Sequence, residues 1–415
     1  MSLKRTRKKN GGRSPHVEMQ AMTNIRTTRK AWPACAAPGR AALALLAAVL
    51  GLAGAGAAPA ADVALKVMSL NILEDTGTPA SSSNAWIRTS GACRRDRVVR
   101  VIVDQAPDIA GLQEAETNQV ADITGTNALA AYAWFGAGRT DGLHAGQHEF
   151  ILYRTNRFVR QDSGVFWLSL TPDVPGSQYP TSALPRIAVW VRLLDRWSGR
   201  PYLVMDTHWD YASAAARLYS AQLIRTRLTA LASNSCIVLT GDLNMFPTEA
   251  AYGALLGTND LQSLQIRDSY RQAIPVEVAN ESTKNNFNNT VAGKRSDFVF
   301  HAGAFTATTA AIVRTTYDGG CYPSDHYPVT ANLSVAALPP ALLSAAAGPA
   351  EFALAWASVS GLPYRVSASP DLVAWQDCFP EAGNCLATGA ESRCSLPLTG
   401  GVARAFYRVE CRPQE

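Results

Sequence analysis

Eight polar side chains of the kinds that bind metal ions or transfer protons stand at the ends of apolar runs. They are Asn71, Glu114, His208, Asp242, Asn244, Asp297, Asp325 and His326. Apolar runs of this length predict strands, so one edge of a sheet assembly could gather all eight. Crowded carboxylates repel one another unless a cation lies between them, and oxygen ligands favour Mg²⁺, Mn²⁺ or Ca²⁺ over zinc. A histidine beside a metal-bound group serves as a general acid or base.

The clearest of these strand ends lies in residues 237–247. Its β-branched and aliphatic residues predict a buried strand that stops at a glycine and delivers Asp242 and Asn244, before Pro247 forces a loop. Residues two apart in a strand point to the same face, so this spacing aims the carboxylate and the amide at one site. A buried aspartate is rare unless it is paired or binds something. This segment alone leaves open a capped strand end without chemistry.

The elements that must position these side chains follow one another along the chain. Strands are expected at residues 65–70, 108–112, 150–154, 164–168, 187–194, 202–206, 237–241, 296–300 and 329–333, and helices at 94–104, 212–231 and 249–256. The helix at 94–104 has an arginine-rich outer face, which we interpret as solvated, with substrate contact as the alternative.

Six short blocks in a fixed order carry a resemblance to a known family. They are Ser69-Leu70-Asn71, Leu112-Gln113-Glu114, Thr207-His208, Gly241-Asp242-Leu243-Asn244, Ser296-Asp297-Phe298 and Ser324-Asp325-His326. With these blocks, residues 65–335 resemble the endonuclease/exonuclease/phosphatase superfamily, also called DNase I-like. The resemblance implies an α/β fold, a four-layer sandwich in which two packed β-sheets are flanked by helices. It also implies an active site that hydrolyses phosphate esters with a divalent cation, usually Mg²⁺.

The resemblance assigns metal binding and phosphate chemistry to the block residues. It makes Glu114 the principal metal ligand, with Asn71 and Asp325 nearby. It makes Asp242 the residue that orients or deprotonates the attacking water, and Asn244 the residue that holds a phosphate oxygen.

The resemblance gives the acid/base roles to two histidines. His326, oriented by Asp297, would stabilise the transition state or act as the acid or base, and His208 would contact the phosphate or help the leaving group. The sequence departs from the family pattern at Ser296, where an aliphatic residue is usual, and at Trp209, where leucine is common. Arg186 is a candidate for phosphate contact, with a surface ion pair as the alternative.

The N-terminus has the pattern of an export signal. Residues 1–40 hold ten Lys/Arg and one acid, and an Ala/Leu run at 41–58 leads to Ala58-Pro59-Ala60. A positive region, an apolar core and an A-x-A site predict a cleaved signal peptide, with an uncleaved anchor as the alternative. We expect a secreted or periplasmic protein without stable membrane insertion. Beyond residue 40 the chain carries 28 basic and 32 acidic residues, so its basic pI is poor evidence for nucleic-acid binding.

The chain divides into four predicted parts. They are a leader and signal peptide at 1–61, the catalytic domain at 62–335, an Ala/Pro-rich linker at 336–350 and a small all-β module at 351–415. The module resembles fibronectin-like β-sandwiches, for which surface or polysaccharide contact is one possible role. It holds four of the eight cysteines, and export would allow disulfides. A Cys93–Cys321 disulfide is a further hypothesis, and Cys236 is expected to be a buried free thiol.

From the sequence we expect a metal-dependent phosphoesterase that cleaves phosphodiesters in the manner of a nuclease. The alternatives are sphingomyelinase-like or small-molecule phosphatase activity, and a non-catalytic surface-binding member. A nucleic-acid substrate requires a basic path for its backbone, which Arg94, Arg95, Arg97 and Arg100 could form locally. A lipid substrate would want exposed apolar loops, for which Trp86, Trp209 and Phe246 are candidates.

Overall fold

The protein is described from a computed structural model of the chain. It describes residues 62–257, 264–340, 342–347, 351–358, 363–370, 373–378, 385–397 and 406–411. The predicted leader and signal peptide, residues 1–61, lie outside the described residues. Among the residues that are described, no helix is long and apolar enough to cross a membrane.

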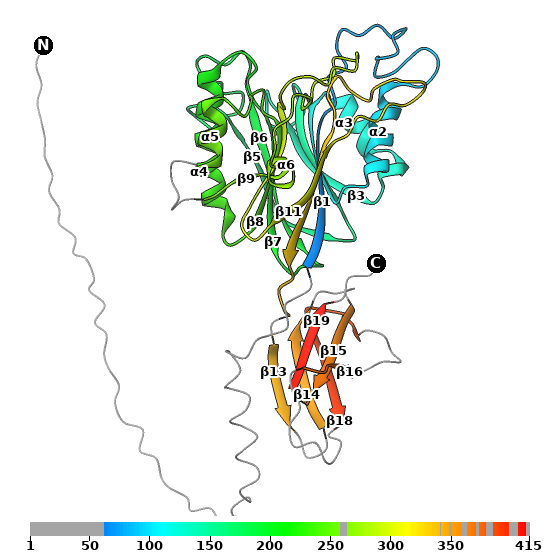
Figure 1. Cartoon of the computed structure of the whole chain (residues 1–415), viewed down its shortest axis with the longest axis vertical. Coiled ribbons are helices and arrows are strands. Elements are labelled where there is room, and N and C mark those ends of the chain that lie inside the picture. The colour runs from blue at the N-terminus through cyan, green and yellow to red at the C-terminus, as the bar shows by residue number, and fades with distance from the viewer. Residues whose placement is uncertain are drawn as a thin grey trace, which may run out of the picture. The chain divides into compact units, whose positions relative to one another are not determined.

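The catalytic domain contains two six-stranded β-sheets (Figure 1). The first has the order β11 (Thr306–Ile312), β12 (Val329–Ala336), β1 (Asp62–Asn71), β2 (Ile109–Ala115), β4 (His148–Arg154), β3 (Tyr132–Gly138). The second has the order β5 (Phe158–Trp167), β6 (Ile187–Asp195), β7 (Pro201–His208), β8 (Cys236–Asp242), β10 (Asp297–Ala302), β9 (Arg267–Asp268). The parallel pairs β1–β2 and β7–β8 end their strands at the same edge of their sheets.

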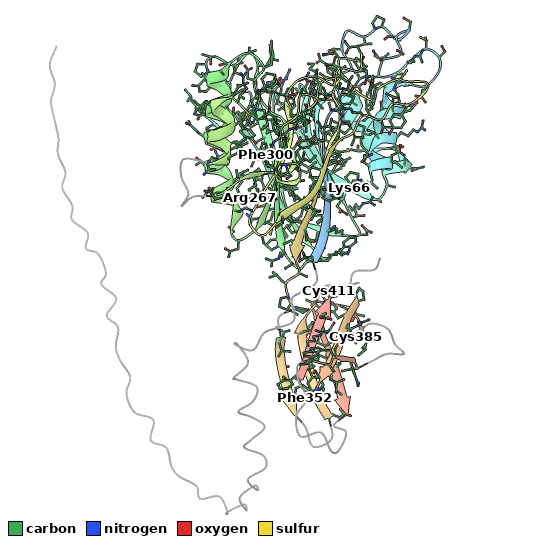
Figure 2. The ribbon with its side chains drawn as sticks, viewed as in Figure 1. Lys66, Arg267, Phe300, Phe352, Cys385 and Cys411 are labelled. Carbon is green, nitrogen blue, oxygen red and sulfur yellow. The ribbon has the colours of Figure 1, made fainter. Side chains whose placement is uncertain are left out.

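A shared apolar core lies between the two sheets. It combines residues such as Leu65 and Val67 of β1 with Val204 of β7 and Val238 of β8, all fully buried. Figure 2 labels Lys66 on β1 and Phe300 on β10, two strands that belong to the two facing sheets. Because successive strand residues alternate between faces, the other face of each sheet needs a second covering layer.

Helices supply these outer layers. Helix α2 (Arg94–Gln105) and α3 (Thr117–Thr124) cover the first sheet, and α4 (Ala214–Ala232) and α5 (Ala250–Leu256) cover the second (Figure 1). On α2, Val98, Val101 and Ile102 pack against the β1 and β2 side chains that face away from the shared core. The predicted four-layer α/β sandwich is confirmed.

The C-terminal module contains two small antiparallel sheets. One contains β13 (Leu342–Ala347), β14 (Glu351–Ala357) and β18 (Glu391–Pro397), and the other β15 (Pro363–Ser369), β16 (Gln376–Asp377), β17 (Cys385–Leu386) and β19 (Phe406–Cys411). Trp356 of β14 and Val366 of β15 are both fully buried in its core. Phe352, Cys385 and Cys411, labelled in Figure 2, pack against that core. The predicted small all-β module is confirmed.

Part of the predicted linker at 336–350 is a strand. Its residues Leu342–Ala347 form β13, which pairs antiparallel with β14. The break falls instead near Pro339 and Pro340, since proline cannot donate to a ladder and small alanines fit a paired strand.

The described cysteines are all free thiols, so the predicted Cys93–Cys321 disulfide is not formed. Cys93 precedes α2 and its Sγ lies 4.0 Å from the carbonyl oxygen of Gly91, whereas Cys321 closes a turn by donating its N–H to Tyr317. Cys236 is 3% exposed at the start of β8, which confirms the expected buried free thiol.

Candidate active site

Strand alternation delivers four of the predicted site residues to one place. Asn71, His208, Asp242 and Asp297 each share the face of their strand that carries the residues of the inter-sheet core. Each lies at the strand end, where the apolar core gives way to polar side chains. All four are at most 3% exposed.

Glu114 reaches the same place by breaking the alternation. On β2, Gln113 has the inward-facing parity, so a regular strand would turn Glu114 toward the helices. The register between β2 and β4 shifts between Leu112 and Ala115, and Glu114 has a positive φ of 64°. A β-bulge of this kind re-aims a side chain, and here it brings the Glu114 carboxylate to Asn71 and His208.

Asn244 also converges on the site, although not by the predicted strand alternation. Strand β8 ends at Asp242, whose Oδ1 accepts from the Asn244 N–H at 3.0 Å, and Asn244 is left-handed with φ 46°. This side-chain turn places the Asn244 amide 2.8 Å from His208 Nε2 and 3.1 Å from the Trp209 carbonyl oxygen, to which it donates. Asn244 and His208 are therefore locked together.

One group of potential metal ligands consists of Glu114, His208 and Asp242, with ligand atoms within 4.8 Å of one another. The Asn71 amide donates to Glu114 Oε1 at 2.7 Å and to Asp242 Oδ2 at 3.1 Å. Its Oδ1 accepts from the Leu73 N–H. In this arrangement Asn71 orients the two carboxylates and does not present an oxygen ligand to a cation between them.

A second group shares Asp242 and adds Asp297 and His326. His326 Nδ1 lies 2.9 Å from Asp297 Oδ2, and its Nε2 lies 3.8 Å from Asp242 Oδ2. Burial alone would lower the pKa of His326, but the charges of Asp297 and Asp242 outweigh it and raise that pKa to about 10. Burial, followed by the charge of Asp297, raises the pKa of Asp242 to about 7.

His208 is the neutral histidine of the pair. Burial, followed by the positive charges of Arg186 and His326, holds the pKa of His208 well below its usual value. Since the Asn244 amide nitrogen can only donate, His208 Nε2 accepts, and the proton of the neutral ring belongs on Nδ1. The site therefore holds one cationic and one neutral imidazole.

Comparisons with known proteins agree with this geometry. The sequence profile of the endonuclease/exonuclease/phosphatase family matches residues 68–326, which is more than half of the chain. The chain belongs to the endonuclease/exonuclease/phosphatase family. The matched region runs from β1 to His326 and so contains every predicted site residue.

Individual relatives support the same assignment. The crystal structure of a family protein from Bacteroides thetaiotaomicron is 30% identical, with a TM-score of 0.59 over 66% of this chain and 96% of that chain. A mannosyl-6-phosphatase from Bacteroides thetaiotaomicron VPI-5482 is 31% identical, with a TM-score of 0.58 over 65% and 99%. An uncharacterised mimivirus protein is 27% identical over 43% of this chain and 67% of its own. As a member of this family, the protein is a hydrolase of phosphate esters.

Asp325 lies next to the site but outside both ligand groups. Its carboxylate is 3.7 Å from Lys284 Nζ and 3.3 Å from Ser324 Oγ, which donates to it. Its backbone carbonyl accepts from the N–H groups of Asn285 and Asn286, which fastens the Asn-rich loop to this segment.

The donor set fits a divalent cation. Glu114 and Asp242 both accept from one amide, and Asp297 adds a third carboxylate within reach of Asp242. Buried carboxylates at this density repel one another, and the charge of Asp297 adds to the larger effect of burial in raising the pKa of Asp242. Carboxylate oxygens suit Mg²⁺, Mn²⁺ or Ca²⁺, so Glu114 and Asp242 are the residues that would hold such an ion.

Arg186 is not in a surface ion pair. It is 4% exposed, and its Nε and Nη1 have no hydrogen-bond partner among the described residues. Glu149, also without a partner for either carboxylate oxygen, lies on β4 opposite the Gln113–Glu114 bulge, and burial raises its pKa to about 8. Sequence reasoning missed Glu149, although an acidic residue within an apolar strand was a usable signal.

Two arginines of α2 are not solvated, contrary to the prediction. Arg94 is fully buried and donates to the backbone carbonyls of Leu73, Glu74 and Asn84, which fixes the loop that follows Asn71. Arg97 is 1% exposed and donates to the Tyr322 carbonyl at 3.0 Å.

The expected exposed apolar loop residues are mostly buried. Trp86 and Trp209 are both fully buried, and the Trp86 indole donates to Asp122. Phe246 is exposed, as predicted.

Proposed function

We propose that the protein is a divalent-cation-dependent phosphatase that hydrolyses small phosphate monoesters. The observation that carries this proposal is the pair of ligand groups that share Asp242, with Asp297–His326 on one side and Glu114–His208 on the other. These two groups together place a cation site, a carboxylate base and an imidazolium next to one another in a buried position. These are the parts that attack by water on a phosphorus atom requires.

The residues divide this work according to their charge. Glu114, with Asp242, would hold the cation, which would supply positive charge to the phosphate oxygens. Asp242 would orient the water and accept its proton, because its carboxylate belongs to both ligand groups. His326, kept protonated by Asp297, donates to the charge that develops on the phosphate.

His208 and Arg186 complete the phosphate site. In this arrangement both hydrogens of the Asn244 side-chain amide are used by His208 Nε2 and the Trp209 carbonyl, so Asn244 positions the neutral His208, which would contact the phosphate beside the leaving group. The buried guanidinium of Arg186, whose Nε and Nη1 have no hydrogen-bond partner among the described residues, supports a role in binding the phosphate anion, because buried donors without acceptors are unfavourable until an anion arrives.

We propose small monoesters as substrates in place of the phosphodiesters that were expected from the sequence. Arg94 and Arg97 are buried and bound to backbone carbonyls, so they do not provide the basic path that a nucleic-acid backbone requires. The relative named as a mannosyl-6-phosphatase, at 31% identity over nearly its whole length, supports a sugar phosphate or a similar small ester.

Export is part of the proposal. The basic start and the Ala/Leu run of residues 1–61 support secretion into the periplasm or the medium. There the C-terminal module would act as a structural or surface-contacting appendage.

The test is turnover by the purified protein with Mg²⁺ and with EDTA. Hexose 6-phosphate, glycerol 3-phosphate, a bis(nitrophenyl) phosphate and single-stranded DNA are the substrates, and we expect Mg²⁺-dependent phosphate release from the monoesters. Asp242→Asn should lower kcat at least a thousandfold, while Asp173→Asn, at an exposed position, should not change it. Activity that survives EDTA, or that is confined to DNA, would overturn the proposal.

A further inference from the structure

Two large aromatic side chains are exposed in the loops that follow His208 and Asn244. Tyr211 is 62% exposed and follows His208 by three residues, and Phe246 is 47% exposed and follows Asn244 by two. They belong to different loops, one after β7 and one after β8. Single exposed aromatics are common, so exposure alone carries nothing.

The two loops are fastened to each other by an ion pair. Arg217 of α4, which is 9% exposed, donates to the Tyr211 carbonyl at 3.3 Å and to Glu249 Oε2 at 2.8 Å. The other oxygen of Glu249 accepts from the Phe246 N–H at 3.1 Å. One guanidinium and one carboxylate therefore join the backbones that carry both aromatic rings.

The inner ends of the same loops are also joined. The Asn244 amide contacts His208 Nε2 and donates to the Trp209 carbonyl. The Asp210 carboxylate accepts from Ser182 and from the N–H groups of Ala183, Ala212 and Ser213. Tyr211 thus lies between two anchored segments.

This construction favours a function for the rings. The Arg217–Glu249 ion pair is partly buried, and its hydrogen bonds hold two loops that expose aromatic rings to solvent. A rigid loop loses little entropy when a ligand packs against it. Aromatic faces pack well against flat or cyclic ligands, as bases do on stacking platforms.

We propose that Tyr211 and Phe246 form a subsite for the ring of the substrate's alcohol portion, which makes the substrates phosphate esters of cyclic sugars. The inference rests on the proposed function, since it assigns the group that leaves from the phosphate bound at His208 and Arg186. The apolar face of the sugar ring packs on the aromatic rings, and the Tyr211 hydroxyl is a donor and acceptor for the sugar's own hydroxyls. Nucleoside monophosphates share the ring chemistry and are the comparison that separates a base from a sugar.

The experiment measures preference between ring-bearing and ring-free esters. The kcat/KM ratio of hexose 6-phosphate to glycerol 3-phosphate should fall about tenfold in Tyr211→Ala or Phe246→Ala and up to a hundredfold in the double variant. Tyr211→Phe, which keeps the ring, should retain most of the preference. Val103→Ala, an exposed apolar residue on α2, is the control and should leave the ratio unchanged.

Binding is measured separately by calorimetry, so that the subsite and the reaction can fail independently. In Asp242→Asn, hexose 6-phosphate should bind at least tenfold more tightly than glycerol 3-phosphate, and Tyr211→Ala with Phe246→Ala should abolish the difference. If the two esters differ in affinity but the wild-type protein hydrolyses neither, the proposed function is refuted and the subsite is retained. Equal affinity for both esters, or a preference for nucleoside monophosphates over hexose phosphates, would overturn the sugar subsite.

Discussion

Asp297→Asn is predicted to shift the pH dependence of activity toward lower pH. The substitution keeps the shape of the side chain and removes its charge. In the wild type His326 holds its proton up to a pKa of about 10, because Asp297 contacts Nδ1 at 2.9 Å and Asp242 lies 3.8 Å from Nε2. As pH rises through that pKa, the imidazolium and the stabilisation that it gives the phosphate are lost.

The size of the effect follows from the rise above the ordinary histidine pKa. A rise from 6.5 to about 10 corresponds to roughly 5 kcal/mol of preference for the charged form. Asp297 is the leading cause of the rise, because its charge ranks above that of Asp242 and it also hydrogen bonds to the ring. Removing it should bring the His326 pKa to roughly 7.5, which leaves about 3% imidazolium at pH 9, a loss near thirtyfold.

The assay is kcat against pH at saturating substrate and Mg²⁺. We expect the variant to be about thirtyfold slower at pH 9 and within a few fold of the wild type at pH 6.5. The acid limb should also move down, because the Asp297 charge raises the pKa of Asp242. Ser296→Ala, which removes a donor to Asp297 but leaves the Asp297 charge in place, is the control and should shift the alkaline limb far less. An alkaline limb that stays in place in the folded variant would refute this role of Asp297.

Three further predictions concern stability, measured by denaturant unfolding. Arg94→Met should lose on the order of 3 kcal/mol, because a fully buried guanidinium would no longer bond to three loop carbonyls. Arg95→Met, on the exposed side of α2, should be nearly neutral, and equal losses in the two variants would contradict this. Gly111→Ala should lose on the order of 3 kcal/mol, because its Cβ would lie 2.0 Å from a buried hydroxyl of the facing sheet, while Gly389→Ala meets nothing within 4 Å. His301→Gln should make the protein less sensitive to acid. Burial lowers the pKa of His301 in the folded state to about 4, so between pH 6.5 and pH 4 mainly the unfolded state binds the proton. This lowers the free energy of unfolding of the wild type by about 2 kcal/mol at pH 5. An unchanged acid sensitivity in that variant would exclude His301 as its cause.

Most strands and the main helices could be predicted because their apolar periodicity is a local property of the chain. The helix expected at 94–104 is observed at Arg94–Gln105, and that at 212–231 at Ala214–Ala232. The same pattern failed for individual side chains of α2, since Arg94 and Arg97 stand on its charged face yet are buried by loops distant in sequence. The periodicity of one helix holds no information about a carbonyl that lies 225 residues away in sequence, such as that of Tyr322.

The site shows the same division. The sequence by itself determined which residues end the strands, and alternation already aimed Asn71, His208, Asp242 and Asp297 inward. Only the tertiary structure decided what they do there, because hydrogen-bond direction and distance depend on residues far apart in the chain.

Three features show what only the folded chain could decide. The bulge at Glu114 reverses the face that alternation assigns to it, and the turn at Asn244 replaces a predicted strand. The Asn71 amide presents its nitrogen to the carboxylates. Opposite electrostatic surroundings then make His326 cationic and His208 neutral, although the two side chains are chemically the same. The sequence named the groups, and the packing of two sheets set their charges.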